Sequence, residues 1–188
     1  TMTPEFASLF NLPGDERNNC IIGDTVHVYN PTTLLPTSKV ALDKSGNPLV
    51  LTKSITLIKQ DETLDVGDNL TGWRQGYRPI KFFVTNDDFK NGRNQSNDLP
   101  IFRYADILLE KAEAITRGGT ATNGQTAQSL FNQIRSYVKA PTIDHKPTLQ
   151  EIYEERGREF FDENWRRNDM IRFGHFEDEF FPHYKGFP

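Results

Sequence analysis

The chain has 188 residues, of which 26% are charged and 12% aromatic, and its formal net charge is −4. This length can bury a full hydrophobic core, and the composition is that of a folded globular protein. Lys and Arg cluster no further than the pair Arg166-Arg167. Because phosphate binding requires clustered cations, nucleic acid is not expected as a partner. The sequence contains no run of about 18 apolar residues, so no transmembrane helix is expected.

Motifs for cofactor chemistry are missing from the sequence. Cys20 is the single cysteine, so neither an internal disulfide nor a cysteine-ligated metal site is expected. The four histidines form no His-x-x-x-His or Glu-x-x-His pair. Phosphate-loop, dinucleotide-binding and nucleophile-elbow motifs are also missing. We therefore expect no metal ion and no other cofactor.

The first half of the chain, residues 1–100, is rich in Gly, Pro, Asn and Thr and contains short β-favouring runs. The segment 43–48 has the composition of a turn that joins two short strands. The runs expected to be extended are residues 25–29, the segment ending at Val40, and residues 49–51, 54–58 and 80–84. This half is therefore predicted to be loop-rich, with a small antiparallel β piece.

The second half, residues 101–180, is predicted to be helical. Apolar residues spaced three and four apart indicate one helix over 101–117 and a second over 125–139. The face expected to be buried in the first helix contains Ile101, Ala105, Leu108, Ala112 and Ile115. Two antiparallel helices with a short connection form a tetratricopeptide-like hairpin. Such a hairpin normally stacks on neighbours, because it cannot bury its apolar face alone.

A third helix is expected over residues 148–164. It begins with Thr148 and Glu151, which have the spacing of a capping box. A further short helix is expected over residues 169–173, and Gly174 is suited to end it. The predicted fold class is therefore mainly α, with a helical hairpin, a further helix and a loop-rich N-terminal half.

Glutamates recur every four residues along the third helix, at Glu151, Glu155, Glu159 and Glu163. Like charges at this spacing repel one another, so the stripe must be solvated or paired with cations. A catalytic pair, as in glycoside hydrolysis, is one interpretation. A structural ion-pair network with arginines such as Arg103, Arg135 and Arg166 is the other, and we favour it because all the glutamates share one helix.

The order and spacing of polar residues in the helical half resemble the C-terminal region of the SusD/RagB family, surface nutrient-binding lipoproteins of Bacteroidetes. The resemblance is closest over residues 77–176 and includes Glu155-Arg156-x-x-Glu159. The matching positions are Arg103, Ala105, Asp106, Glu113, Ala114, Asn132, Arg135, Glu155, Arg156, Glu159, Glu163, Arg166, Asp169 and Arg172. One departure is Asn164, which stands where glycine is common; asparagine tolerates the left-handed backbone region that glycine favours.

The resemblance implies a single domain over residues 1–188 that corresponds to a C-terminal fragment of a longer protein. Members of this family are lipid-anchored to the outer membrane and exposed at the cell surface. They cap a TonB-dependent transporter and deliver captured glycans, or in some cases peptides, to it. The resemblance thus implies membrane attachment only through a lipid anchor outside this chain. It also implies that the matching residues are scaffold positions and that the protein is not an enzyme.

Ligand contacts are expected instead from aromatic side chains, because the apolar face of a sugar ring stacks on an exposed Trp or Tyr. Trp73 and Tyr77 lie in a polar, glycine-flanked segment with Arg74, whose planar donors suit sugar hydroxyls. We therefore predict ligand binding by Trp73, Arg74 and Tyr77. The alternative is that each aromatic residue only fills the edge of the core.

Three functions fit the sequence. The first is non-catalytic binding of an oligo- or polysaccharide at the outer-membrane surface, with delivery to a TonB-dependent transporter. An alternative is a helical-repeat module that binds a protein or peptide. A third is a glycan-cleaving enzyme that uses Glu159 and Glu163. The resemblance favours the first.

Overall fold

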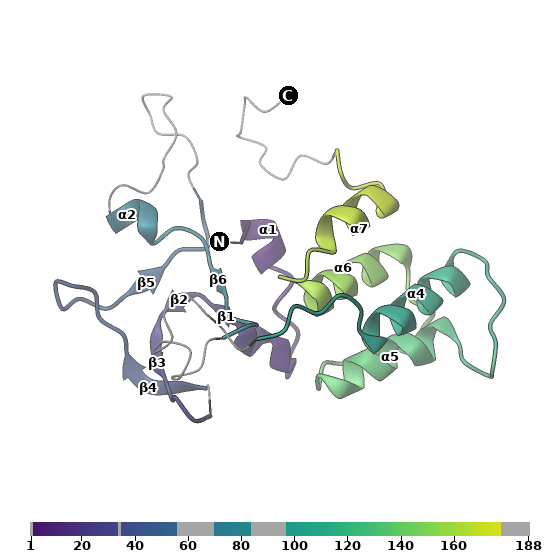
Figure 1. Ribbon diagram of the computed structural model, residues 1–188, viewed down its shortest axis with the longest axis horizontal. Helices are drawn as coiled ribbons and strands as arrows, with labels where there is room; N and C mark the ends of the chain where they lie inside the picture. Colours follow the sequence, from purple (N-terminus) through teal and green to yellow (C-terminus); the bar gives the residue numbers. More distant parts are fainter. Residues whose placement is uncertain (1, 34, 56–69, 84–96, 178–188) are drawn as a thin grey trace. The chain divides into compact units, whose positions relative to one another are not determined.

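The computed structural model describes residues 2–33, 35–55, 70–83 and 97–177, and Figure 1 labels its elements. The described chain divides into two compact units. The loop-rich unit contains residues 2–8 and the described residues between 19 and 97, and the helical unit contains residues 9–18 and 98–177. The single domain expected from the sequence stays a prediction.

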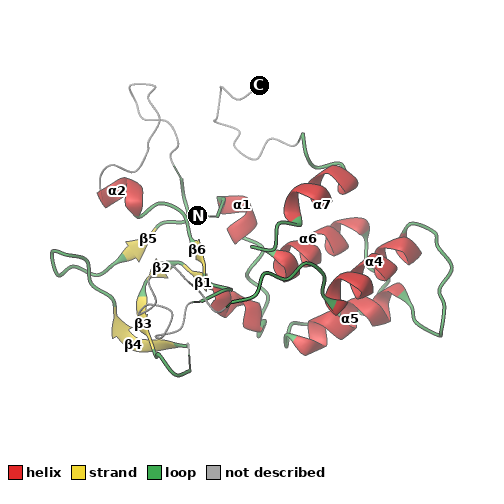
Figure 2. Cartoon of the chain, in the orientation of Figure 1, coloured by secondary structure: helices red, strands yellow, loops and turns green. Residues whose placement is uncertain are grey.

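In the described part of the loop-rich unit, the strands form three two-stranded antiparallel pairs (Figure 2). They are β1 (Ile21–Ile22) with β6 (Arg78–Pro79), β2 (Asp24–Thr25) with β5 (Val50–Leu51), and β3 (His27–Tyr29) with β4 (Pro36–Val40). The described part of this unit also contains two short helices, α1 (Pro4–Ala7) and α2 (Leu70–Trp73). The small antiparallel β piece predicted from the sequence is therefore confirmed.

The single strand expected over residues 25–29 is divided between two partners. The change occurs at Val26, whose N–H donates to the Leu49 carbonyl and whose carbonyl accepts from the Ala41 N–H. The predicted turn lies between these partners and is closed by an antiparallel bridge between Leu42 and Pro48. The extended segment that contains β2 and β3 thus pairs with both strands of the hairpin that follows it, β5 and β4.

Two of the other expected strands differ in the structure. The run 80–84 was expected to be extended, but the strand is β6 at Arg78–Pro79, and Lys81 and Phe82 form a turn. The β1–β6 pairing ends after Pro79. The next residue, Ile80, lies opposite Cys20, which belongs to the 3-10 helix Glu16–Cys20. In the run 54–58, residues 54 and 55 are irregular, and the rest lies outside the described residues.

The helical unit contains α4 (Tyr104–Thr116), α5 (Ala127–Tyr137), α6 (Leu149–Phe160) and α7 (Arg166–Phe173). Helices α4 and α5 pack together in opposite directions, as the predicted hairpin requires (Figure 1). None of the helices in the described ranges is long and apolar enough to cross a bilayer.

Local capping explains several of the helix boundaries. Thr148 accepts from the Glu151 N–H at 3.2 Å, and the Glu151 carboxylate accepts from the Thr148 N–H at 2.8 Å, which confirms the predicted capping box. Gly174 ends α7 with a φ of 79°, in the left-handed region. Asn164, between α6 and α7, has a φ of 65°, so it adopts the conformation for which glycine is the usual residue.

Helix α4 begins three residues later than the expected start at Ile101. The backbone at Arg103 is extended, with φ −128° and ψ 156°, and its carbonyl accepts from the Asp106 N–H at 2.9 Å. Ile101 therefore precedes the helix and is 72% exposed, so its assignment to the buried face was wrong. The spacing of apolar residues alone could not predict where α4 begins. The extended backbone at Arg103 occurs together with contacts between its side chain and residues distant in the sequence.

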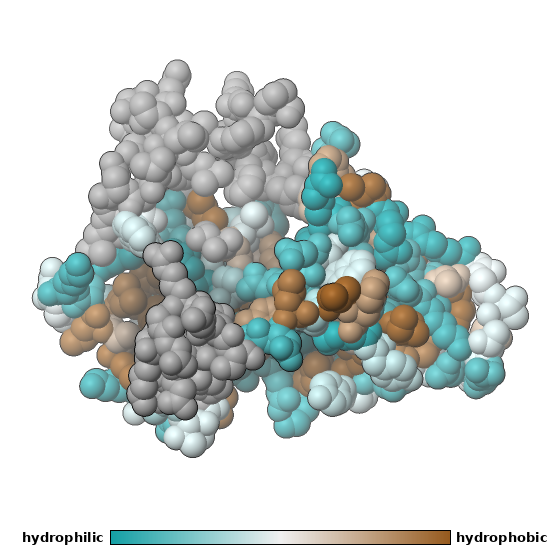
Figure 3. Space-filling view, in the orientation of Figure 1, coloured by the Kyte–Doolittle hydropathy of each residue, from teal (hydrophilic) through white to brown (hydrophobic). Residues whose placement is uncertain are grey.

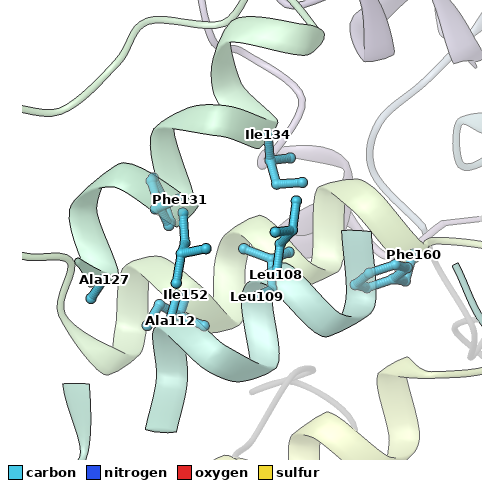
Figure 4. Packing of buried hydrophobic residues seen from close by; sticks show 9 residues of the cluster. Leu108, Leu109, Ala112, Ala127, Phe131, Ile134, Ile152 and Phe160 are labelled. Atoms are coloured by element: carbon cyan, nitrogen blue, oxygen red, sulfur yellow. The ribbon is translucent and has the colours of Figure 1, made fainter. Parts of the chain in front are cut away.

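The core of the helical unit lies between α4, α5 and α6. Figure 4 shows its apolar side chains pointing toward one another from the three helices. The buried cluster consists of Leu108, Leu109, Ala112, Ala127, Leu130, Phe131, Ile134, Ile152 and Phe160. Each large side chain buried in this way contributes about 1.5–3 kcal/mol relative to an exposed one. On the visible surface of this unit, hydrophobic residues form small groups among hydrophilic ones (Figure 3).

Candidate functional site

The glutamates of α6 and the residues after it are bound by arginines from other parts of the helical unit. Arg103 binds two of them at once. Its Nη1 donates to Glu159 Oε1 at 2.7 Å, and its Nε and Nη2 donate to the two Glu163 oxygens at 2.9 and 2.8 Å. The same guanidinium also donates to the Glu159 carbonyl at 2.8 Å. The predicted contact between Arg103 and these glutamates is therefore confirmed.

Glu155 is the most deeply buried of these carboxylates, with an exposed fraction of 0%. Its Oε2 accepts from Arg135 Nε at 2.6 Å and from Arg158 Nη1 at 3.2 Å, and its Oε1 accepts from Arg17 Nη2 at 2.8 Å. Arg17 also donates to Glu159 Oε2 at 3.1 Å. Three guanidinium groups thus compensate one buried carboxylate, which provides the pairing that a buried charge requires.

Arg17 is the member of this network that the sequence analysis missed. Asp15 fixes its orientation, accepting from Arg17 Nε at 3.0 Å and from Nη2 at 2.7 Å. Burial lowers the pKa of Arg17, but hydrogen bonds and charges from Asp15 and Glu155 outweigh burial and raise this pKa above its ordinary value. Arg17 is 138 positions from Glu155, and no helical periodicity marks it, so no local signal in the sequence pointed to it.

A second buried network joins α4, α6 and α7. Arg156 donates to Asp106 Oδ1 at 2.7 Å and to Asp169 Oδ1 at 2.9 Å. Arg172 links Asp169 to Glu113, at 3.0 and 2.9 Å. All five residues belong to the pattern that resembles the SusD/RagB family, and their contacts agree with the scaffold role that the resemblance implied.

The third predicted arginine, Arg166, contacts an aromatic side chain. Its guanidinium carbon lies 3.7 Å from the centre of the Tyr153 ring, and its Nη1 donates to the Tyr153 carbonyl at 2.9 Å. Burial lowers the pKa of Arg166. This arginine therefore packs α7 against the aromatic side of α6.

The geometry of Glu159 and Glu163 suits a structural role. General acid catalysis requires a carboxyl group that retains its proton near neutral pH and faces a substrate cleft. Both oxygens of each glutamate instead accept hydrogen bonds from arginine side chains within the helical unit. Of the two interpretations of the glutamate stripe, the contacts favour the ion-pair network.

Trp73, the first predicted ligand-binding residue, is the last residue of α2 and is 70% exposed. Its ring therefore does not fill the edge of the core, which was the alternative interpretation. The loop that follows is well connected: the Thr52 N–H donates to the Arg74 carbonyl at 2.9 Å, and the Gly76 N–H donates to the Thr52 carbonyl at 2.8 Å. The structure thus presents a large exposed aromatic ring on a backbone that is held in place.

Arg74, the second predicted residue, takes part in an ion pair. Its Nη2 donates to Asp43 Oδ2 at 2.6 Å. Asp43 lies in the turn between β4 and β5, where its Oδ1 also accepts from the backbone N–H of Ser45 and Asn47. Backbone hydrogen bonding from Asn47, together with that from Ser45 and the Arg74 charge, lowers the pKa of Asp43. The Arg74 side chain therefore ties the Trp73 loop to the neighbouring turn.

Tyr77, the third predicted residue, has its ring against Gly23, where an added Cβ would lie 2.6 Å from ring atoms. Its hydroxyl donates to Asp24 Oδ1 at 2.6 Å. This hydrogen bond, with a smaller effect of burial, raises the pKa of Tyr77 to about 12. The structure thus brings Trp73 and Arg74 together on one loop, whereas the Tyr77 ring packs on the backbone at Gly23.

Within the described ranges, no group of His, Cys, Asp and Glu side chains is arranged to hold a metal ion.

The sequence matches the SusD family over residues 14–188. It is also 32% identical over 112 residues to the starch-binding protein SusD of Bacteroides thetaiotaomicron. That alignment covers 58% of this chain and 19% of the relative, so the chain spans a small part of that protein's length. Because the family match includes nearly the whole chain, this protein belongs to the SusD family.

Proposed function

We propose that this chain belongs to a glycan-binding protein of the outer-membrane surface, which captures oligo- or polysaccharide without cleaving it. Membership of the SusD family and the similarity to a starch-binding protein support the proposal. The observation that carries it in the structure is the exposed Trp73 ring on a connected loop. A flat exposed ring on a supported backbone is the geometry that stacking on a sugar requires.

In this mechanism the apolar face of one sugar ring covers the Trp73 indole, and hydroxyl groups bind polar groups at the edge. Arg74 has five N–H donors, and Asp43 accepts from one of its terminal nitrogens, so the guanidinium can also donate to a hydroxyl. Stacking with a few hydrogen bonds gives modest affinity, which allows the ligand to be passed on. Tyr77 contributes indirectly, because it supports the chain beside the loop.

No covalent bond of the glycan is broken in the proposed mechanism. The carboxylates that a glycosidase would use are Glu159 and Glu163, and both are bound by arginines. The ligand is released unchanged to a TonB-dependent transporter. Attachment to the outer membrane through a lipid anchor keeps the protein at the surface beside that transporter. Membership of the SusD family supports the transporter, the anchor and the location as parts of this proposal.

An oligosaccharide panel tests this function. Starch-derived maltooligosaccharides and other glycans are incubated with the chain, and binding and sugar length are measured by calorimetry and chromatography. The expected result is retention of at least one glycan at unchanged length. Trp73→Ala should weaken binding by about tenfold, which corresponds to about 1.4 kcal/mol of lost stacking, whereas Trp73→Phe keeps an aromatic face. Shortened sugar, or unchanged affinity in Trp73→Ala, would contradict the proposal.

A second candidate function is a module that binds a protein or peptide. The observation in its favour is an exposed apolar stretch at the start of α4, because such patches mark interaction surfaces. The exposed residues are Leu99, Ile101, Phe102, Tyr104 and Ile107. In that case no glycan of the panel is retained. Peptides from a library bind the chain instead, and Phe102→Ser weakens this binding.

A further inference from the structure

The loop that carries Trp73 is organised around one side chain, Arg78. Its Nη2 donates to the Trp73 carbonyl at 2.8 Å, and its Nη1 donates to the Gln75 carbonyl at 2.7 Å and to the Gly76 carbonyl. The Arg74 carbonyl accepts from the Thr52 N–H. Every carbonyl from residue 73 to residue 76 therefore has a donor, and Arg78 supplies three of the four.

This loop needs such external donors because α2 contains only four residues. The last carbonyls of a helix have no partner within it, and a single helical turn is not stable by itself. The chain also changes direction at Gly76, where φ is 73°. Without Arg78, the carbonyls of Trp73, Gln75 and Gly76 would turn toward water, and the indole at the end of α2 would lose its fixed orientation.

The backbone of Arg78 is itself held in place by strand pairing. Its backbone lies in β6 and pairs with Ile22 of β1, so the guanidinium extends from a strand to the loop. The planar guanidinium has five donors in a fixed arrangement, which suits several carbonyls better than the flexible ammonium of lysine. Within the described part of the chain, this side chain donates its hydrogen bonds to backbone carbonyls of residues 73–76.

We propose that Arg78 is a positioning residue for ligand binding: it does not touch the glycan but holds the Trp73 ring in its binding orientation before the glycan arrives. The inference rests on the proposed function. A ring that is already oriented loses little conformational freedom on binding, whereas a mobile one must be ordered at a cost in affinity. Arg74 differs from Arg78 because its side chain binds Asp43 and remains available at the edge of the site.

The test separates ring mobility from affinity. The chain has two tryptophans, so Trp165→Phe leaves Trp73 as the only indole fluorophore. In this background, time-resolved fluorescence anisotropy reports local motion of Trp73 in the ligand-free protein. The variants are Arg78→Met, which removes all donors, and Arg78→Lys, which keeps the charge. Lys39→Met, at an exposed position of β4, is the matched control. Thermal unfolding confirms that each variant is folded.

The expected result is faster and wider motion of Trp73 in Arg78→Met, partial restoration in Arg78→Lys and no change in Lys39→Met. Affinity for a maltooligosaccharide should fall by about tenfold in Arg78→Met, which corresponds to about 1.4 kcal/mol of ordering cost. Unchanged anisotropy in a folded Arg78→Met variant would overturn the positioning role. Increased motion with unchanged affinity would also overturn it, because the ring would then not serve binding. If the parent chain binds no glycan, the proposed function fails, and the anisotropy still decides whether Arg78 orients Trp73.

Discussion

Arg17 Nη2 lies 2.8 Å from Glu155 Oε1, although the two residues are 138 positions apart in the sequence. This contact holds the segment Leu9–Asn18 against α6 within the helical unit. The same unit holds that segment through the Leu9 carbonyl, which accepts from Arg158 Nε at 2.8 Å. The ion-pair network is therefore not a property of the helices alone.

Replacing Arg17 with Met should destabilise the helical unit. Asp15 would lose its guanidinium partner, and Glu155 would keep only Arg135 and Arg158. Because both carboxylates are buried, we expect a loss of about 3 kcal/mol in the free energy of unfolding, at the lower end of the range for removing one partner of a buried pair. Urea unfolding followed by circular dichroism measures it. Arg167→Met, at an exposed position, is the control, and equal stability of both variants would contradict the network.

Glu159→Gln should lower the melting temperature and leave glycan binding unchanged. The amide keeps an acceptor but removes the charge that Arg17 and Arg103 share. The Arg103 side chain is partly exposed, so we expect a loss of about 2–3 kcal/mol, less than for a fully buried pair. Glu110→Gln on the exposed side of α4 controls for the change of charge. A loss of sugar cleavage with full stability would instead indicate a catalytic glutamate.

The pKa of Tyr77 gives a prediction for alkaline pH. The hydrogen bond to Asp24 raises this pKa from 10.0 to about 12, so the folded state retains the phenol proton longer than the unfolded state. Its contribution to stability is therefore complete below pH 10 and is lost as the pH rises through 10 to about 12. Ultraviolet titration at the tyrosinate band should show a late-titrating group that disappears in Tyr77→Phe. A Tyr77 that ionises near pH 10 would rule out the hydrogen bond.

Gly23→Ala should disturb the packing of Tyr77. An alanine Cβ would lie 2.6–2.7 Å from three atoms of the Tyr77 ring, closer than van der Waals contact permits. The ring would have to move, and its hydroxyl would leave Asp24, so we expect a loss of about 1–3 kcal/mol, as for overpacking in a core. The thermal transition and the alkaline titration of Tyr77 should both change. In a Tyr77→Ala background the same substitution should have little effect, and an equally large effect there would point to another cause.

The sequence by itself determined the helices, because the signals that make them are local. A capping box at Thr148, a glycine at 174 and apolar residues at helical spacing act within a few residues of each other. They indicate that each helix exists, although a tertiary contact at Arg103 accompanies the later start of α4. The scaffold residues could also be recognised, since their order along the chain matches a family pattern. Which arginine binds which glutamate could not be assigned, because several arginines have similar reach.

Only the tertiary structure decided the partners. The segment around Val26 has one extended pattern, yet it pairs with two strands, and the sequence does not encode where the change occurs. The sequence is compatible with Trp73 as an exposed ring and with Trp73 as a filler at the core edge. In the structure Trp73 is 70% exposed, and its carbonyl accepts a hydrogen bond from Arg78. Arg17 joins the buried network from a distant segment. Side chains far apart in sequence meet only once packing has fixed the backbone, so local periodicity and propensity carry no information about these contacts.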